Sequence, residues 1–136
     1  MRVFLDTNVL ASALATRGLC ADILREVINS DELIVSDPLL VEWHRILPRK
    51  FNVPKSLVEE LITFLQRDTI HSQIGDLLDI RIKDKDDIII LSSAISGKAD
   101  LFVTGDKEVL SLGKVGRMEI LSPRGFWDKT RKRKRA

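Results

Sequence analysis

Short apolar runs alternate with helical patterns along most of the chain, and this alternation limits its fold more than any other feature. Runs typical of buried strands lie at Arg2–Leu5, Leu33–Val35, Leu101–Val103 and Met118–Leu121, with weaker ones at Thr69–Ile74 and Asp79–Ile82. Helical patterns fill most of the intervals between these runs. This order predicts a three-layer α/β fold, in which helices cover both faces of a central, mainly parallel sheet of four to five strands.

The helices between these runs carry start signals and apolar stripes. Ser36-Asp37-Pro38 combines capping residues with a proline in the first helical turn. The stripe that follows consists of Leu39, Leu40, Trp43, Ile46 and Leu47. Further helical segments are expected at Leu10–Leu14, Ala21–Ile28, Ser56–Asp68, Ile88–Ser96 and Lys107–Leu110. The segment Ser56–Asp68 is apolar on more than one side, which favours burial in the core over a dimer contact or a partner-binding groove.

Charge is unevenly distributed along the 136 residues. Residues 129–136 carry six cations and no acid, whereas residues 1–128 hold 16 basic and 20 acidic side chains, a net charge of −4. We therefore expect one domain over 1–128 and a basic tail over 129–136, with disorder as the favoured interpretation of the tail. The single Cys20 excludes an internal disulfide, and no apolar run reaches transmembrane length. These features predict a cytoplasmic protein without a membrane segment.

Two acidic residues follow strand patterns directly. Asp6 comes immediately after Arg2–Leu5, and Asp106 closely follows Leu101–Val103. In open parallel sheets, ligand sites form beyond the carboxyl ends of the strands, so both acids should lie at the same edge of the sheet. Each also has an ordinary alternative role as the cap of the helix that follows it.

Two further acidic positions lie on helices. Glu42 falls at the edge of its helix's apolar stripe, which is compatible with the rim of a site. In the helix expected at Ile88–Ser96, the serines at positions 92, 93 and 96 are interpreted as the polar side. Extending this helix back to Asp87 places that residue on the opposite, buried side. A buried carboxylate is costly unless it is paired or binds a metal, so Asp87 is preferred over Asp86. Asp84 and Asp86 are expected to be loop or cap residues.

Carboxylates that converge on one site repel each other, and a divalent cation resolves that conflict. Mg²⁺ and Mn²⁺ prefer oxygen ligands, which suits phosphate chemistry. The sequence has no Cys/His spacing typical of zinc, and His44 and His71 are isolated. An oxygen-only site for Mg²⁺ or Mn²⁺ is therefore expected.

At this point the pattern resembles a known family. The chain looks like the PIN-domain family, which includes the VapC-type toxins of prokaryotic toxin–antitoxin systems. The segments that carry the likeness are Phe4–Leu10, Val35-Ser36 through Glu42, Asp86-Asp87 through Ala94, Ala99–Asp106, and Ile120–Pro123 followed by Phe126. It covers nearly the whole chain except the basic tail, and the order and spacing of the segments together are specific.

The resemblance implies a site and an activity. The family's four acidic positions fall on Asp6, Glu42, Asp87 and Asp106, which are the implied catalytic residues and metal ligands. The supporting positions fall on Thr7, Asn8 and Thr104. Where many relatives have Asp two residues after the last acid, this chain has Glu108, which leaves a fifth acidic role open. The implied function is a Mg²⁺- or Mn²⁺-dependent ribonuclease that hydrolyses RNA phosphodiester bonds, as the toxin of a toxin–antitoxin pair, with an antitoxin and a homodimer as implied partners.

Three alternatives stay open. The first is a non-catalytic PIN-fold protein that acts by docking a partner, although the intact set of four acids counts against it. The second is an aspartate-nucleophile phosphatase, but its second aspartate would fall on Asn8. The third is a response-regulator receiver domain, whose acidic pair and central phosphoacceptor strand do not match this order. For the tail, capture of RNA phosphates is the alternative to disorder.

Overall fold

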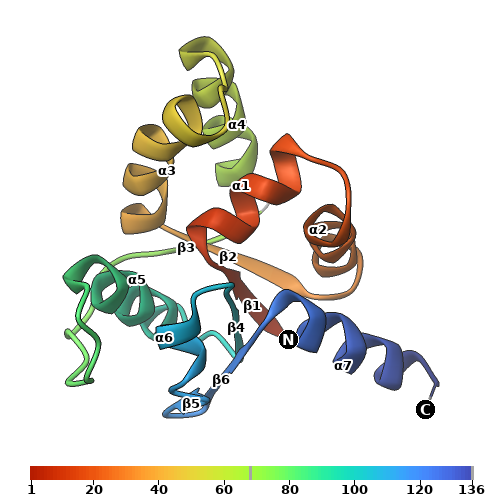
Figure 1. Ribbon diagram of the computed structural model, residues 1–136, viewed down its shortest axis with the longest axis vertical. Coiled ribbons are helices and arrows are strands. Elements are labelled where there is room, and N and C mark those ends of the chain that lie inside the picture. Colours follow the sequence, from red (N-terminus) through yellow and green to blue (C-terminus); the bar gives the residue numbers. More distant parts are fainter. Residues whose placement is uncertain (68, 136) are drawn as a thin grey trace.

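The computed structural model describes residues 1–67 and 69–135, and within these ranges one sheet is flanked by helices (Figure 1). The strands are β1 Arg2–Leu5, β2 Glu32–Ser36, β3 Ile70–Ser72, β4 Leu101–Val103, β5 Lys114–Val115 and β6 Met118–Leu121. The helices are α1 Thr7–Ala15, α2 Leu19–Ser30, α3 Asp37–Lys50, α4 Lys55–Arg67, α5 Lys85–Ser96, α6 Lys107–Leu110 and α7 Pro123–Arg135. Asp68, the last residue expected in the fourth helix, lies outside the described residues.

The sheet has the order β3-β2-β1-β4-β6-β5, and every neighbouring pair is parallel except β5 with β6. The prediction of an α/β fold with a mainly parallel sheet is confirmed. The strand count was too low, because β5 has only two residues and pairs as a short antiparallel extension of β6. The run Asp79–Ile82 forms no strand.

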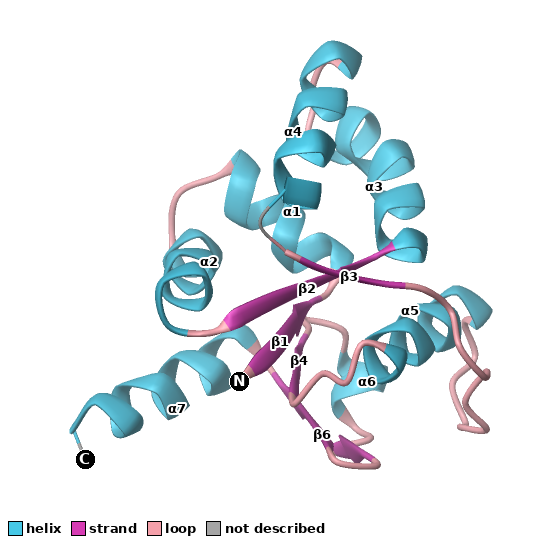
Figure 2. Cartoon of the chain, turned by 180° about the vertical axis from the view of Figure 1, so that it is seen from behind, coloured by secondary structure: helices cyan, strands magenta, loops and turns pink. Residues whose placement is uncertain are grey.

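The core lies on both sides of the two central strands. Phe4 on β1 and Phe102 on β4 stack with their ring centroids 5.2 Å apart. Trp43 on α3 is fully buried, as the apolar stripe predicts. In Figures 1 and 2, α1 to α4 lie on one side of β2, and α5 and α6 lie on the other. None of the described helices is both long and apolar enough to cross a membrane.

The basic end of the chain is helical, which corrects the expectation of a disordered tail. Residues 129–135 continue α7 in one helix that starts at Pro123. Phe126 and Thr130, one turn apart on this helix, are almost fully buried. In Figure 1, α7 begins after β6 close to the N-terminus and extends away from the sheet.

Ion pairs fix the cations of α7 to the body of the protein. Lys129 Nζ lies 3.3 Å from Glu119 of β6, and Lys134 Nζ lies 2.9 Å from Glu26 of α2. Arg133 pairs at 3.5 Å with Asp31, whose side chain is only 2% exposed. The acidic body therefore attracts the basic helix by charge. Two of these three ion pairs join residues about a hundred positions apart, which local composition does not reveal.

The order of the strands places a crevice between β1 and β4. From β1 the chain continues to β2 on one side, whereas β4 lies on the other side of β1. Helices that leave neighbouring parallel strands in opposite directions open a crevice at their carboxyl ends, where ligands bind in such folds. Asp6 and Asp106 come just after β1 and β4, so this topology brings them to the crevice as predicted.

Candidate active site

A buried threonine joins the two acids that follow the central strands. Thr104 is fully buried, and its Oγ1 donates a hydrogen bond to Asp6 Oδ2 at 2.7 Å. The same oxygen accepts a hydrogen bond from the backbone amide of Asp106 at 3.1 Å. The second oxygen of Asp6 accepts from the amide of Thr7 at 2.8 Å. Thr104 therefore orients Asp6 and fixes the backbone that carries Asp106.

Asp6 and Asp106 also cap helices, which the sequence allowed as an alternative to a role in the site. Asp6 is the N-cap of α1, and Asp106 is the N-cap of α6, where its Oδ1 accepts from the amides of Glu108 and Val109. In each carboxylate, one oxygen satisfies the helix start. The second oxygen of Asp106 makes no such cap bond, so capping and ligand binding are compatible in the same side chain.

Glu108 has a structural contact of its own. Its Oε1 accepts a hydrogen bond from the backbone amide of Lys83 at 3.1 Å. Lys83 immediately precedes Asp84, the N-cap of α5. Glu108 thus fastens the segment that leads into α5 to the start of α6, which gives this residue a role outside the acidic set.

Glu42 is brought to the site by the packing of α3 on α1. Ser36 caps α3 by accepting from the amide of Leu39 at 3.3 Å. One turn further, the Trp43 indole nitrogen donates to the backbone oxygen of Thr7 at 3.1 Å. This bond joins the residue after Glu42 to the residue after Asp6, and the two half-buried carboxylates lie close enough for the charge of Asp6 to raise the pKa of Glu42.

Asp87 enters the site from the first turn of α5. The helix begins at Lys85, three residues earlier than expected, and Asp84 caps it by accepting from the amide of Asp86 at 2.8 Å. Asp86 is exposed and pairs with Arg45 of α3 at 3.9 Å, whereas Asp87 is half-buried. The preference for Asp87 over Asp86 thus agrees with their burial.

The serines of α5 do not mark a solvent-exposed side of the helix, and the prediction that they do was wrong. Ser92 and Ser93 are almost fully buried. Their hydroxyls donate to the carbonyls of Ile88 and Ile90 at 2.6 and 2.7 Å, and Ser93 Oγ also lies 2.8 Å from Ser36 Oγ. Serine satisfies its own hydroxyl on the preceding helical turn, so it can be buried without a polar partner elsewhere.

Burial and mutual repulsion raise the pKa values of the first two acids. Burial raises the pKa of Asp6, against hydrogen bonds from Thr104 and the Thr7 amide, and the charge of Asp106 raises it further. Burial also raises the pKa of Glu42, and the charge of Asp6 adds to this. Each of these carboxylates is therefore harder to ionise in the folded protein than in water.

Asp87 shows the largest effect. Burial raises its pKa from the ordinary 3.8 to about 7, and the charges of Asp84, Asp106, Asp6 and Glu42 contribute in that order. Three of those four charges belong to the expected acidic set. The set therefore acts as one electrostatic group whose charges are not balanced by a buried cation among the described residues.

Three acids of the set line a polar cleft of about 360 Å³, and Asp6 lies behind it. Its walls include Glu42, Asp87 and Asp106 together with Asn8, while Asp6 and the buried Thr7 and Thr104 are not on its surface. Three cations of α3 also line it: Arg45, Arg49 and Lys50. The sequence analysis missed these cations, although Arg45 and Arg49 follow Glu42 by three and seven residues, the spacing of one helix face.

The residues present fit a hard divalent ion with water in its shell. The donors are carboxylate oxygens, and their raised pKa values show that a positive charge placed among them would be favoured. Thr7 is a buried residue whose hydroxyl lies close to Glu42 and lowers the pKa of that carboxylate. Within the described residues no three His, Cys, Asp or Glu side chains lie close enough together to hold a metal ion directly. An ion that keeps several waters, as Mg²⁺ does, can be bound by one or two carboxylates directly and by others through its water molecules.

Comparison with solved structures finds the same fold in 14 chains, including the following two. A chain of VapBC2 from Rickettsia felis, in a crystal structure with a DNA fragment from its promoter, matches with a TM-score of 0.66 and 16% identity, over 90% of this chain and 98% of that one. The PIN domain endonuclease Utp24 matches with a TM-score of 0.55 and 16% identity, over 89% of this chain and 84% of that one. No curated protein matches the sequence.

A family comparison agrees with the architecture. The family model described as PIN domain matches residues 2–108, which include all four expected acids from Asp6 to Asp106. The match spans most of the sheet and the whole crevice between β1 and β4. Together, the sheet order, the acidic cleft and this match show that the chain belongs to the PIN-domain family.

Proposed function

We propose that the protein is a divalent-metal-dependent ribonuclease that hydrolyses RNA phosphodiester bonds. The observation that carries this proposal is the convergence of four carboxylates at one crevice, where burial, and after it repulsion between the acids, raises the pKa of Asp87 to about 7. Ionisation of all these carboxylates together is unfavourable, and a bound cation would stabilise their charged forms. The fold neighbour Utp24 is described as an endonuclease, which supports nuclease chemistry for the same fold.

Asp6, Glu42, Asp87 and Asp106 would hold Mg²⁺ or Mn²⁺. When bound there, the ion supplies Lewis-acid stabilisation of the charge that develops on the phosphate and lowers the pKa of a water molecule. Thr104 orients Asp6 through its 2.7 Å hydrogen bond and keeps the carboxylate in one rotamer. The Asn8 side chain offers a further polar group at the wall of the cleft, and the buried Thr7 hydroxyl lies close to Glu42.

The cations of the cleft support a polyanionic substrate. Arg45 makes only a 3.9 Å pair with the exposed Asp86. Arg49 and Lys50 are exposed and make no ion pair within the described residues, although five acids line the same cleft. Cations that are left available beside acids can bind the phosphates on either side of the cleavage point, which also offsets the repulsion between substrate and carboxylates.

The biological role that fits best is the toxin of a toxin–antitoxin pair in the cytoplasm. The support is the resemblance to VapC-type proteins and the fold shared with VapBC2. An antitoxin protein is then the expected partner, and a homodimer the expected assembly. Mass measurement in solution, with the protein expressed alone and together with the product of a neighbouring reading frame, tests both.

Incubation of the purified protein with an RNA oligonucleotide and with DNA of the same sequence tests the activity. We expect cleavage of RNA in Mn²⁺ or Mg²⁺, no cleavage in excess EDTA, and restoration when the ion is added back. Equal cleavage of DNA would remove the RNA preference. If neither substrate is cut under any of these conditions, the non-catalytic role as a partner-docking protein becomes the better account.

A further inference from the structure

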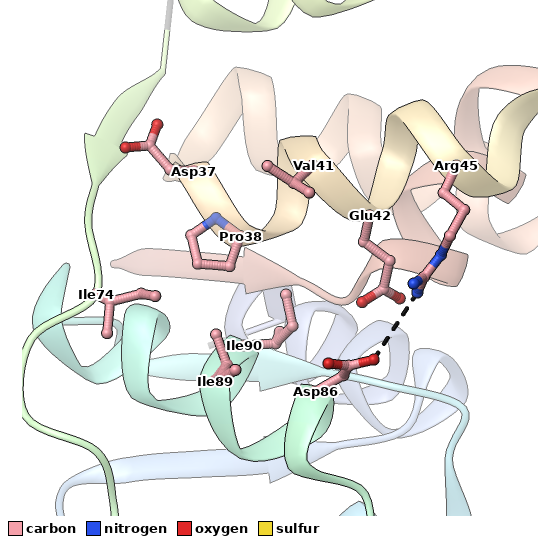
Figure 3. Close-up of a pocket in the computed structure, with 9 residues that line it drawn as sticks. All are labelled: Asp37, Pro38, Val41, Glu42, Arg45, Ile74, Asp86, Ile89 and Ile90. Carbon is pink, nitrogen blue, oxygen red and sulfur yellow. Dashed lines mark ion pairs between the residues drawn. The ribbon is translucent and has the colours of Figure 1, made fainter.

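A second, apolar groove adjoins the acidic cleft, and the reaction as proposed does not use it. It has a volume of about 440 Å³ and lies between α3 and α5 (Figure 3). Its apolar walls are Pro38, Val41, Ile74, Ile89 and Ile90. Val41 is 70% exposed and Ile74 is 50% exposed, so these side chains are not part of the hydrophobic core. A concave apolar surface of this size is typical of a small-ligand site.

The groove is continuous with the cleft. Glu42, Arg45 and Asp86 line both cavities, and Figure 3 shows them together at one end of the groove. A strand whose phosphate lies among the acids must therefore place a neighbouring nucleotide at the mouth of the groove. RNA that is read base by base is single-stranded, and its unstacked bases are inserted between apolar side chains or against arginine planes.

The chemistry of the groove suits a flat ring with polar edges. The apolar residues of α3 face those of α5, so the two helices can enclose the faces of a ring. The ends carry both kinds of hydrogen-bonding group: Arg45 donates, and Asp37 and Asp86 accept. Asp37 is held by an ion pair with His71, and Asp86 by Arg45, so both carboxylates are positioned.

We propose that this groove binds one nucleobase of the RNA, next to the phosphate that is cleaved, with Arg45 at the junction between base and phosphate. This inference rests on the proposed function, because the cleft defines which nucleotide reaches the groove. It makes Val41 and Ile74 specificity-determining residues: they act on the choice of cleavage position and leave the metal site untouched.

The test uses an RNA oligonucleotide that the wild type cuts at one position, and a series in which each neighbouring nucleotide in turn lacks its base. Base stacking on a protein surface contributes on the order of five- to a hundredfold in binding. We expect one abasic position to reduce kcat/KM of the wild type by about tenfold. Val41→Asp and Ile74→Asp should reduce kcat/KM on the intact RNA by a similar factor and be indifferent to that abasic position.

Leu77→Asp is the matched control. Leu77 is 64% exposed on the same connecting segment as Ile74, and it does not line the groove. This variant should retain the wild-type response to base removal. Because all three substituted residues are exposed, the variants should fold, and their melting temperatures verify this before the kinetics are compared.

The proposal is overturned if no abasic position affects the wild type, or if Val41→Asp keeps the full wild-type dependence on the base. It is also overturned if the groove variants cleave normally and instead lose a protein partner. Binding to the same oligonucleotides, measured by fluorescence anisotropy with Asp6→Asn to prevent cleavage, separates this failure from that of the proposed function. Base-dependent binding that Val41→Asp abolishes supports the groove even if no RNA is cut, whereas cleavage without base dependence supports only the proposed function.

Discussion

Thr104 Oγ1 donates a hydrogen bond to Asp6 Oδ2 at 2.7 Å and accepts one from the Asp106 amide at 3.1 Å. One hydroxyl thus connects the carboxyl ends of β1 and β4. Replacement by Val keeps the shape of the side chain and removes both bonds. We expect Thr104→Val to reduce metal affinity or cleavage by about 10- to 100-fold, as loss of a group that orients a metal ligand does.

The same variant should reduce the free energy of unfolding by about 1–3 kcal/mol, because the Asp106 amide loses its partner. Urea denaturation measures this. Thr104→Ser is the control, since it retains the hydroxyl and should restore most of the activity. Equal loss in Ser and Val variants would show that shape, and not the hydrogen bond, holds the site together.

Asp87 makes the stability of the metal-free protein depend on pH. Its pKa is raised from 3.8 to about 7, so between these values the folded protein binds more protons than the unfolded chain. The free energy of unfolding therefore falls as the pH rises through this window. We expect a higher melting temperature at about pH 5 than at about pH 8 in EDTA, and Asp87→Asn should reduce the difference.

Added Mn²⁺ should oppose this trend. Binding requires ionised carboxylates, so the ion stabilises the protein more at about pH 8 than at about pH 5, and its binding releases protons. Thermal unfolding with and without Mn²⁺ at both pH values measures the effect. A melting temperature that Mn²⁺ leaves unchanged at the higher pH would contradict a metal site on Asp87.

Arg49 and Lys50 should contribute to RNA binding through charge. For single strands, the slope of log K against log salt changes by about 0.7 for each phosphate contact. The double variant Arg49→Gln/Lys50→Gln should therefore flatten the slope by about 1.4 and weaken binding at low salt. Arg17→Gln/Lys55→Gln removes two exposed cations outside the cleft and should leave the slope as it is.

Deletion of 129–136 should destabilise the fold. It removes Arg133 (one of two partners of Asp31), the partner of Glu26 and the buried Thr130, which predicts a loss of about 1–3 kcal/mol in the free energy of unfolding. Lys132→Gln is the control, because Lys132 is exposed and makes no ion pair within the described residues. An unchanged melting temperature combined with weaker RNA binding would instead favour capture of RNA by the basic end.

The sequence predicts the position of the acidic edge of the sheet but not the helix α7. Asp6 and Asp106 were placed correctly at one edge because apolar runs end directly before them and parallel strands align their ends. The α7 helix was missed because only Phe126 and Thr130 mark its buried face, and its acidic partners lie far away in the sequence. A run of cations reads as solvated unless those partners are known.

The site shows the same division. The sequence shows the order of the acids along the chain. It does not show which face of α5 is buried, because Ser92 and Ser93 hydrogen-bond to carbonyls of their own helix and can therefore lie in the core. The spacing of Arg45 and Arg49 places them on one helix face with Glu42. The orientation of this face toward the other acids depends on the contact of Trp43 with Thr7. Such contacts arise only when distant segments pack.

The central claim is that Asp6, Glu42, Asp87 and Asp106 bind a divalent ion and that the protein needs this ion to cleave RNA. Single-turnover cleavage of one RNA in Mn²⁺ by wild type and Asp6→Asn tests it most directly, because Asn keeps the shape and the helix cap but removes the charge. Metal stabilisation of the developing charge contributes several kcal/mol, so the rate should fall on the order of a thousandfold. A rate equal to that of the wild type, or wild-type cleavage that persists in excess EDTA, would contradict the account.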